Sequence, residues 1–180
     1  MKSLLLSLTM LVLLSGCQAY STGRYEPSAD NVGKLHSFTG KTLSVGKFSS
    51  TSSVISQVSC NYLFPIKTPD GDHFSDFIRK AIIDELMASN MYSSSSGLSI
   101  NGNVEDIEFS SSEGFWKLSV RVNFSNGKSV EVAENYTFRG NPNAEGAICS
   151  ESAQQLIPAV QNLIGKIIRS PEFGNFVQYY

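Results

Sequence analysis

Residues 116–124, WKLSVRVNF, alternate apolar and polar side chains without a break. Successive side chains of a strand point to opposite faces, so this alternation predicts a β-strand with one buried and one solvated face. The strand is followed by Ser125-Asn126-Gly127-Lys128, and the Asn-Gly pair is typical of a tight hairpin. We therefore expect this strand to belong to an antiparallel sheet.

A strand is expected on either side of this one. Residues 98–109 predict the preceding strand, in which Gly102 indicates a bulge after which the inward face switches toward Ile107 and Phe109. Beyond the hairpin, alternate positions predict a third strand, with Glu134 as the one polar side chain on its inward face. The apolar positions of this third strand are Val130, Val132, Tyr136 and Phe138.

Two amphipathic helices flank the three strands. Over residues 74–86 apolar side chains recur at helical spacing, interrupted only by Glu85, and Asp72 is the expected N-cap. The second helix is expected over residues 150–169. Pro158 lies inside it and should kink or split it, because proline lacks an N–H and its ring obstructs the preceding turn. Pro171 follows the predicted end.

The chain thus predicts an α+β fold class. Residues 42–48 form the expected opening strand, and residues 58–64 an extended segment that Pro65 and Pro69 confine to an edge or a loop. The order β-α-β-β-β-α predicts a two-layer sandwich, in which two helices cover one face of an antiparallel or mixed four-stranded sheet. We expect a single domain over residues 42–180.

The amino terminus predicts export. Lys2 precedes an apolar run from Leu4 to Leu14, which suits a secretory signal and falls short of the about 20 residues that a bilayer span needs. The run ends in Leu14-Ser15-Gly16-Cys17, which resembles the lipobox of bacterial lipoproteins. That resemblance implies cleavage after residue 16, diacylglycerol on the Cys17 sulfur and acylation of the new amino terminus. The alternative is an ordinary secretory signal with Cys17 as a thiol.

The residues after Cys17 indicate in which membrane the protein lies and how the domain is joined to the lipid. Gln18, where the similar enteric lipoproteins carry Asp for inner-membrane retention, favours the outer membrane and its periplasmic face. Residues 17–41 are polar and show little periodicity, which predicts a lipidated tether. The same segment has the alternative of docking along the domain.

Two further cysteines remain, Cys60 and Cys149. An even pair in an oxidising compartment predicts one disulfide bond. The alternative, a redox-active pair, lacks the Cys-x-x-Cys spacing.

Three runs of residues carry a family resemblance: Leu43–Phe48, Phe74–Leu86 and Gly102–Ile107. Together with the element order, they are similar to the YajG-like group of small Gram-negative outer-membrane lipoproteins. They also resemble the wider set of envelope auxiliary lipoproteins with a TolB-amino-terminal-like layer. The resemblance spans residues 42–170 and implies an accessory role in envelope assembly or transport, without catalytic residues. The cysteine pair is not part of that pattern.

The sequence is poor in residues that carry catalysis. With 14 basic and 16 acidic residues the net charge is −2, which argues against nucleic-acid binding. His36 and His73 are the only histidines. Asp70-Gly71-Asp72-His73 has too few ligands for a zinc or EF-hand site and suits a helix entrance better. We expect no catalytic set, metal or cofactor.

The carboxyl terminus is aromatic. Four of its last eight residues, Phe173, Phe176, Tyr179 and Tyr180, are candidates for partner binding, with the alternative that they fold back over the core. The sequence therefore favours a non-enzymatic, lipid-anchored outer-membrane lipoprotein that binds another envelope protein. A periplasmic binder of a small ligand or glycan is the alternative, followed by an enzyme with an unfamiliar site.

Overall fold

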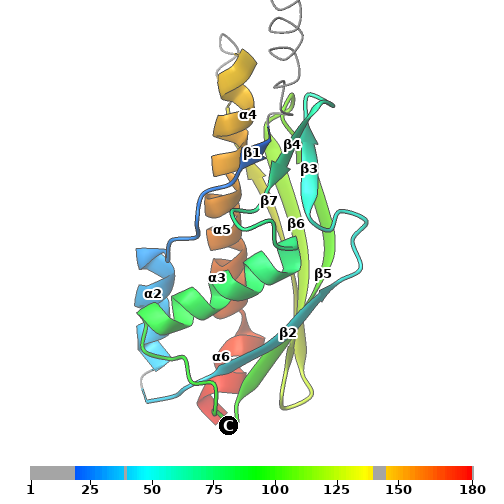
Figure 1. Ribbon diagram of the computed structural model, residues 1–180. Helices are drawn as coiled ribbons and strands as arrows, with labels where there is room; N and C mark the ends of the chain where they lie inside the picture. The colour runs from blue at the N-terminus through cyan, green and yellow to red at the C-terminus, as the bar shows by residue number, and fades with distance from the viewer. Residues whose placement is uncertain (1–18, 39, 140–144, 180) are drawn as a thin grey trace, which may run out of the picture.

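The computed structural model describes residues 19–38, 40–139 and 145–179 (Figure 1). It is an α+β fold in which a long mixed sheet is covered on one side by helices. Within the described residues, no helix has the length and apolarity to cross a bilayer. The predicted signal, with Cys17, lies outside these residues.

The main sheet contains the four predicted strands. They are β2 (Ser44–Ser50), β5 (Ser99–Ser110), β6 (Phe115–Phe124) and β7 (Ser129–Thr137), in the order β2-β5-β6-β7. The three later strands form an antiparallel meander, whereas β2 pairs with β5 in parallel. The sheet is mixed because the chain crosses over a helix between β2 and β5.

Strand β6 confirms the alternation of residues 116–124. Its even-numbered side chains from Trp116 to Phe124 are all buried. The odd-numbered Lys117, Arg121 and Asn123 are exposed on the opposite face. This half-buried pattern gives β6 five side chains in the core. The Trp116 indole N–H donates a hydrogen bond to the Ser152 carbonyl at 2.9 Å.

Strand β5 switches its inward face, as predicted, but further along the strand. Ile100 and Val104 are buried on one side of the switch and Ile107 on the other. The pairing with β6 shifts between Val104 and Asp106, so the bulge lies at Glu105 and not at Gly102. Gly102 instead lies under the Phe48 ring, where a Cβ would approach the ring Cε1 to 2.1 Å.

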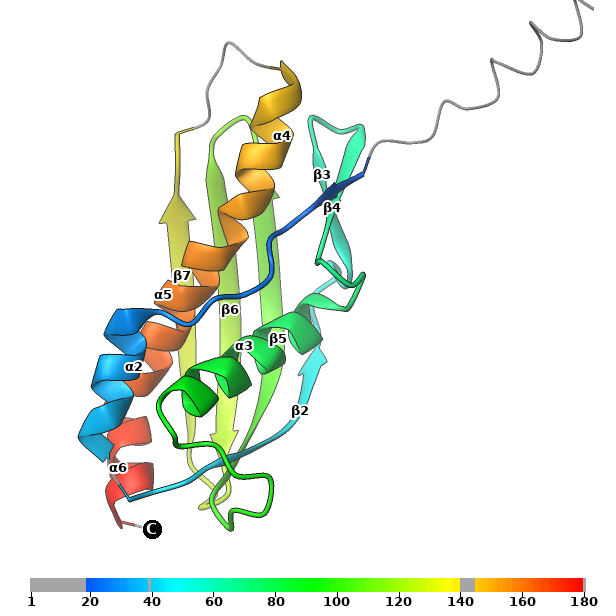
Figure 2. The same ribbon diagram turned by 60° about the vertical axis from the view of Figure 1, so that its left-hand side comes forward.

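Two helices cover the inner face of the sheet (Figure 2). Helix α3 (Phe74–Ala88) packs on β2 and β5, while α5 (Leu156–Arg169) packs on β6 and β7. The predicted apolar stripe of α3 is buried, and Glu85 is buried with it. The N-cap is His73 and not Asp72, because the helix begins at Phe74, and the His73 side chain makes no capping hydrogen bond. The Asp72 carboxylate instead forms an ion pair with Lys80.

The predicted second helix is split in two. Helix α4 (Glu145–Gln154) and α5 are separated at Gln155. Pro158 explains this position, because it offers no N–H to the Gln154 carbonyl four residues earlier and its ring crowds that carbonyl. After α5, where the sequence predicts only a helix stop at Pro171, that proline instead opens a further helix, α6 (Pro171–Tyr179).

A second, small sheet lies at the end of the molecule opposite α6 (Figure 1). It contains β1 (Tyr20–Ser21), β4 (Phe64–Lys67) and β3 (Gln57–Cys60), in that order. The extended segment predicted over residues 58–64 is thus a hairpin between β3 and β4. Cys60 in β3 and Cys149 in α4 form the predicted disulfide, with Cα atoms 5.7 Å apart.

The segment predicted as a tether packs on the domain. After β1, the chain forms α2 (Ala29–Leu35) and a 3₁₀ turn (His36–Phe38) that lie beside α5 and α3 (Figure 2). Leu35 and Phe38 are buried in the core. Of the two alternatives for this segment, the structure therefore shows docking over residues 20–38, and the folded unit starts well before residue 42.

Candidate functional site

The aromatic carboxyl terminus is mostly core. Phe173 and Phe176 are buried, and the Phe176 ring stacks on Phe124 with the ring centroids 4.8 Å apart. Their prediction as partner-binding residues is wrong, because α6 turns their side chains inward. Tyr179 is 76% exposed and stays a candidate for partner binding. Tyr180 and Cys17 lie outside the described residues.

Glu85 is a buried acid of α3 that bonds the amino-terminal segment. One oxygen, Oε1, accepts hydrogen bonds from Tyr25 Oη at 2.6 Å, from the Ser28 backbone N–H at 3.0 Å and from Asn31 Nδ2 at 3.1 Å. The other oxygen is buried and has no hydrogen-bond partner among the described residues. This carboxylate thus holds the start of α2 against α3.

Tyr25 is kept protonated by this arrangement. Burial is the largest cause that raises the pKa of its hydroxyl far above the ordinary value of 10.0. The hydrogen bond to Glu85 and the negative charges of Glu85 and Asp84 raise that pKa further. Tyr25 therefore remains a neutral donor in the alkaline range in which an exposed tyrosine ionises.

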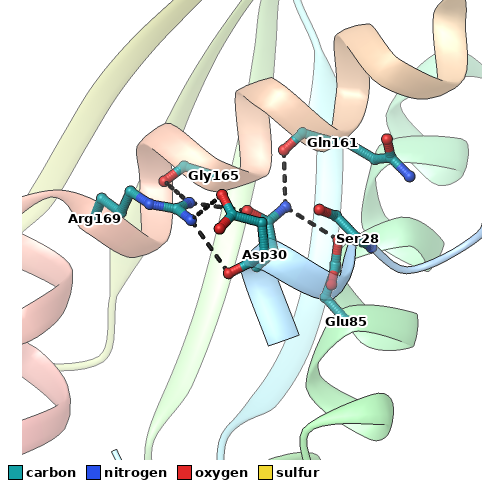
Figure 3. Close-up of polar contacts among 7 residues, drawn as sticks. Ser28, Asp30, Glu85, Gln161, Gly165 and Arg169 are labelled. Carbon is teal, nitrogen blue, oxygen red and sulfur yellow. Dashed lines mark hydrogen bonds and ion pairs between the residues drawn. The ribbon is translucent and has the colours of Figure 1, made fainter. Parts of the chain in front are cut away.

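Helix α5 completes the cluster from the other side (Figure 3). Asn31 Nδ2 also donates to the Gln161 carbonyl at 2.8 Å, and Arg169 donates to Asn31 Oδ1 at 2.9 Å. Arg169 pairs with Asp30 at 2.7 Å. Gly165 lets α2 approach closely, because a Cβ there would lie 2.9 Å from Asn31 Oδ1.

Glu134 is the second buried acid on an apolar face. It points from β7 toward α5, where Lys166 Nζ lies 2.7 Å from its Oε2 and Asn162 Nδ2 donates to its Oε1 at 3.1 Å. Lys166 also donates to the Ala133 carbonyl at 2.6 Å. The negative charge of Glu134, the one polar side chain predicted on the inward face of the third strand, is thus neutralised by Lys166 of the helix that covers it.

Between α2, α5 and β7 lies an open groove of about 660 Å³. Its walls carry Asn31, Glu134, Lys166 and Arg169. These charged and amide groups already bind one another, as described above. The groove therefore offers a ligand few uncommitted donors or charges.

The outer face of the main sheet carries rows of paired charges. Arg121 on the central strand β6 reaches Glu105 on β5 at 2.9 Å and also pairs with Glu131 on β7. Lys117 pairs with Glu108 at 2.9 Å, and this carboxylate raises the Lys117 pKa. These side chains are between 30% and 53% exposed, and the helices lie on the opposite face of the sheet (Figure 2).

The acidic turn before α3 is structural. Asp70 pairs with Arg24 at 2.9 Å, while Asp72 pairs with Lys80 and raises its pKa. No cluster of three or more His, Cys, Asp or Glu side chains suited to a metal ion occurs in the described part of the chain. Both aspartates are engaged in tying the turn to neighbouring segments.

No family model and no curated protein matches the chain. Among solved structures, a Xanthomonas campestris protein of the DUF330 family is similar, with a TM-score of 0.49 and 10% identity, over 84% of this chain and 95% of that one. A second, described as an uncharacterized protein, has a TM-score of 0.48 and 11% identity over 83% and 99%. Similarity at this level assigns neither a family nor a function.

In the sequence, Glu85 and Glu134 stand out only as acidic residues on otherwise apolar faces. Such a position indicates a polar cluster, because a buried acid requires hydrogen-bond or charge partners. The partners of Glu85 lie 54 to 60 residues away along the chain, where no periodicity could identify them.

Proposed function

We propose that this chain is a lipid-anchored lipoprotein of the outer membrane, facing the periplasm and similar to the YajG-like group. It acts without catalysis, as an accessory that binds another envelope protein. The observation that carries the proposal is the run Leu14-Ser15-Gly16-Cys17 at the end of a short apolar segment. Two or more acyl chains anchor a protein stably, whereas one chain alone is marginal.

The outer face of the main sheet is the proposed surface for the protein partner. Its charges, at Glu105, Glu108, Lys117, Arg121 and Glu131, form a rigid polar pattern on regular strands. Paired surface charges contribute little to stability, about 0–1 kcal/mol each, but complementary charge patterns select partners and guide their approach. These charge pairs are therefore better explained by partner recognition than by a contribution to stability.

The groove beside α2 supports the alternative, a periplasmic binder of a small ligand or glycan. Its size is within the range of small-molecule sites, about 300–1,000 Å³, but such sites are mostly apolar with a few free polar groups. Here Lys166 and Arg169 are already paired with Glu134 and Asp30. We therefore place this alternative second.

In-cell photo-crosslinking tests the proposal. A crosslinking residue is placed at Asn123 or Asn135 on the outer sheet face, with exposed Met87 on α3 as the matched control. We expect one envelope protein to be captured at both sheet positions and not at the control, and to be lost with Cys17→Ser.

Two outcomes contradict the proposal. A chain that stays in the outer membrane but captures no protein from the sheet face would favour the ligand-binding alternative. A chain found free in the periplasm would overturn the lipid anchor.

A further inference from the structure

The tip of the β3–β4 hairpin exposes two large apolar side chains. Tyr62 is 97% exposed and Leu63 is 79% exposed, more than any other large hydrophobic side chain in the described residues. Single exposed apolar residues are common on protein surfaces, but two adjacent ones at the end of a projecting hairpin form a protruding apolar point.

The backbone of the tip is unusual for these residues. Asn61 and Tyr62 have φ angles of 48° and 61°, and the Leu63 N–H donates to the Cys60 carbonyl at 3.1 Å. Tight hairpin turns with two left-handed residues prefer glycine at the second of these positions. A tyrosine there is costly for folding and is turned outward, so the folded domain gives no reason for it.

The base of the hairpin is rigid. Cys60, the residue before the turn, is tied to α4 by the disulfide with Cys149. The Asn61 backbone N–H donates to the Ser111 hydroxyl at 3.2 Å, and that hydroxyl donates to Asn61 Oδ1 at 3.1 Å. The tip is therefore held in one orientation relative to the main sheet.

The same end of the molecule receives the amino-terminal chain. Tyr20 in β1 pairs with Ile66 in β4, and its ring contacts the Phe64 ring with centroids 5.9 Å apart. Because β1 and β4 run parallel, the chain enters β1 from the end of β4 at which Leu63 lies. Cys17 is three residues before Tyr20, and three residues reach at most about 11 Å.

We propose that Tyr62 and Leu63 insert into the interfacial layer of the bilayer that holds the Cys17 lipid. This inference rests on the proposed lipid anchor. Tyrosine suits the interface, where its ring contacts acyl chains and its hydroxyl contacts water, and leucine adds apolar area below it. With two attachment points the domain is oriented, so that the hairpin end meets the membrane and α6 points away from it (Figure 1).

Fluorescence quenching by brominated lipid tests the inference. The full-length, lipidated protein is reconstituted into phosphatidylethanolamine and phosphatidylglycerol vesicles with brominated acyl chains, as Tyr62→Trp. The matched control is Tyr179→Trp, an exposed tyrosine at the opposite end, and the signal of the buried Trp116 in wild type is subtracted. We expect a blue shift and loss of emission for Tyr62→Trp and neither for Tyr179→Trp.

The outcomes separate this inference from the anchor on which it rests. Flotation with vesicles and the mass of the lipidated amino terminus report on the anchor. A protein that floats but shows equal quenching at both positions overturns the insertion of the tip and leaves the anchor intact. A protein that neither floats nor carries lipid overturns both.

A second variant checks that the tip has no structural role. Tyr62→Gly supplies the residue that the turn prefers, so we expect the urea midpoint of the domain in solution to stay the same or rise. A clear fall in that midpoint would mean that Tyr62 serves folding, and it would overturn the inference.

Discussion

At the scale of single residues, Glu85 joins segments that are far apart in sequence. Its Oε1 accepts three hydrogen bonds from the segment between Tyr25 and Asn31, and all of them come from outside its own helix. A buried acceptor of this kind adds little net stability while its hydrogen bonds are formed, but its removal leaves the buried donors without a partner.

We expect Glu85→Ala to lower the free energy of unfolding by about 2–5 kcal/mol, because buried donors on Tyr25 and Ser28 lose their acceptor. Urea unfolding of the domain from residue 19 measures this. Asp76→Ala, which removes an exposed acid from the same helix, should cost no more than about 1 kcal/mol. Equal losses in the two variants would contradict the role of Glu85.

The raised pKa of Tyr25 predicts a loss of stability at alkaline pH. Above pH 10 the unfolded chain releases the tyrosine proton while the folded chain keeps it, so the free energy of unfolding falls as pH rises. The loss should reach at most about 1.4 kcal/mol per pH unit. Urea titrations from pH 8 to 11 should show a smaller decline for Tyr25→Phe. Parallel declines would refute the prediction.

At the scale of elements, β2 and β5 pack closely where an aromatic ring of β2 lies over a glycine of β5. Phe48 and Gly102 are paired neighbours, and the ring occupies the space that a side chain at Gly102 would need. The parallel pairing at the edge of the main sheet therefore depends on this close fit.

Gly102→Ala should destabilise the domain by about 1–3 kcal/mol through overpacking. In a double-mutant cycle, the same change should cost much less in a Phe48→Ala background, because the ring is gone. Additive effects in urea unfolding would show that Gly102 is required for another reason.

The disulfide links the small sheet to α4. It closes a loop across a sequence separation of 89, for which chain entropy predicts a stabilisation of about 4–5 kcal/mol. We expect reductant to lower the urea midpoint of the wild-type domain. The variant Cys60→Ala with Cys149→Ala should show the low midpoint with or without reductant. An unchanged wild-type midpoint would contradict this.

At the scale of the whole molecule, the amino-terminal segment is part of the fold. Leu35 and Phe38 contribute to the same core as the main sheet, and β1 extends the small sheet. The fold therefore begins at β1, whose first residue, Tyr20, comes three residues after Cys17 in the sequence.

A chain that starts at residue 42 should be less stable than one that starts at residue 19. It loses the burial of two large apolar side chains, about 3–6 kcal/mol in total, and leaves Glu85 without its donors. Urea unfolding of both chains measures the difference. Equal midpoints would mean that residues 19–41 do act as a tether.

Several features were predictable because they depend on near neighbours. The alternation of residues 116–124 determined the central strand and its inward face, and helical spacing determined α3. Pro158 determined that the last long helix is broken, since its effect acts within four residues. The two remaining cysteines sufficed for the disulfide.

Other features depend on contacts between distant parts of the chain. Residues 20–38 have no periodicity that predicts docking, and their place is set by Glu85, by Arg169 and by the close approach at Gly165. The sequence left two alternatives for the carboxyl-terminal aromatics, partner binding or folding back over the core, and α6 places Phe173 and Phe176 in the core. The sequence alone thus determined the four strands of the main sheet, the main helices and the cysteine pairing, because their physical causes are local or combinatorial. Only the tertiary structure decided which end segments join the core, because burial depends on surfaces that exist only once the sheet and helices have packed.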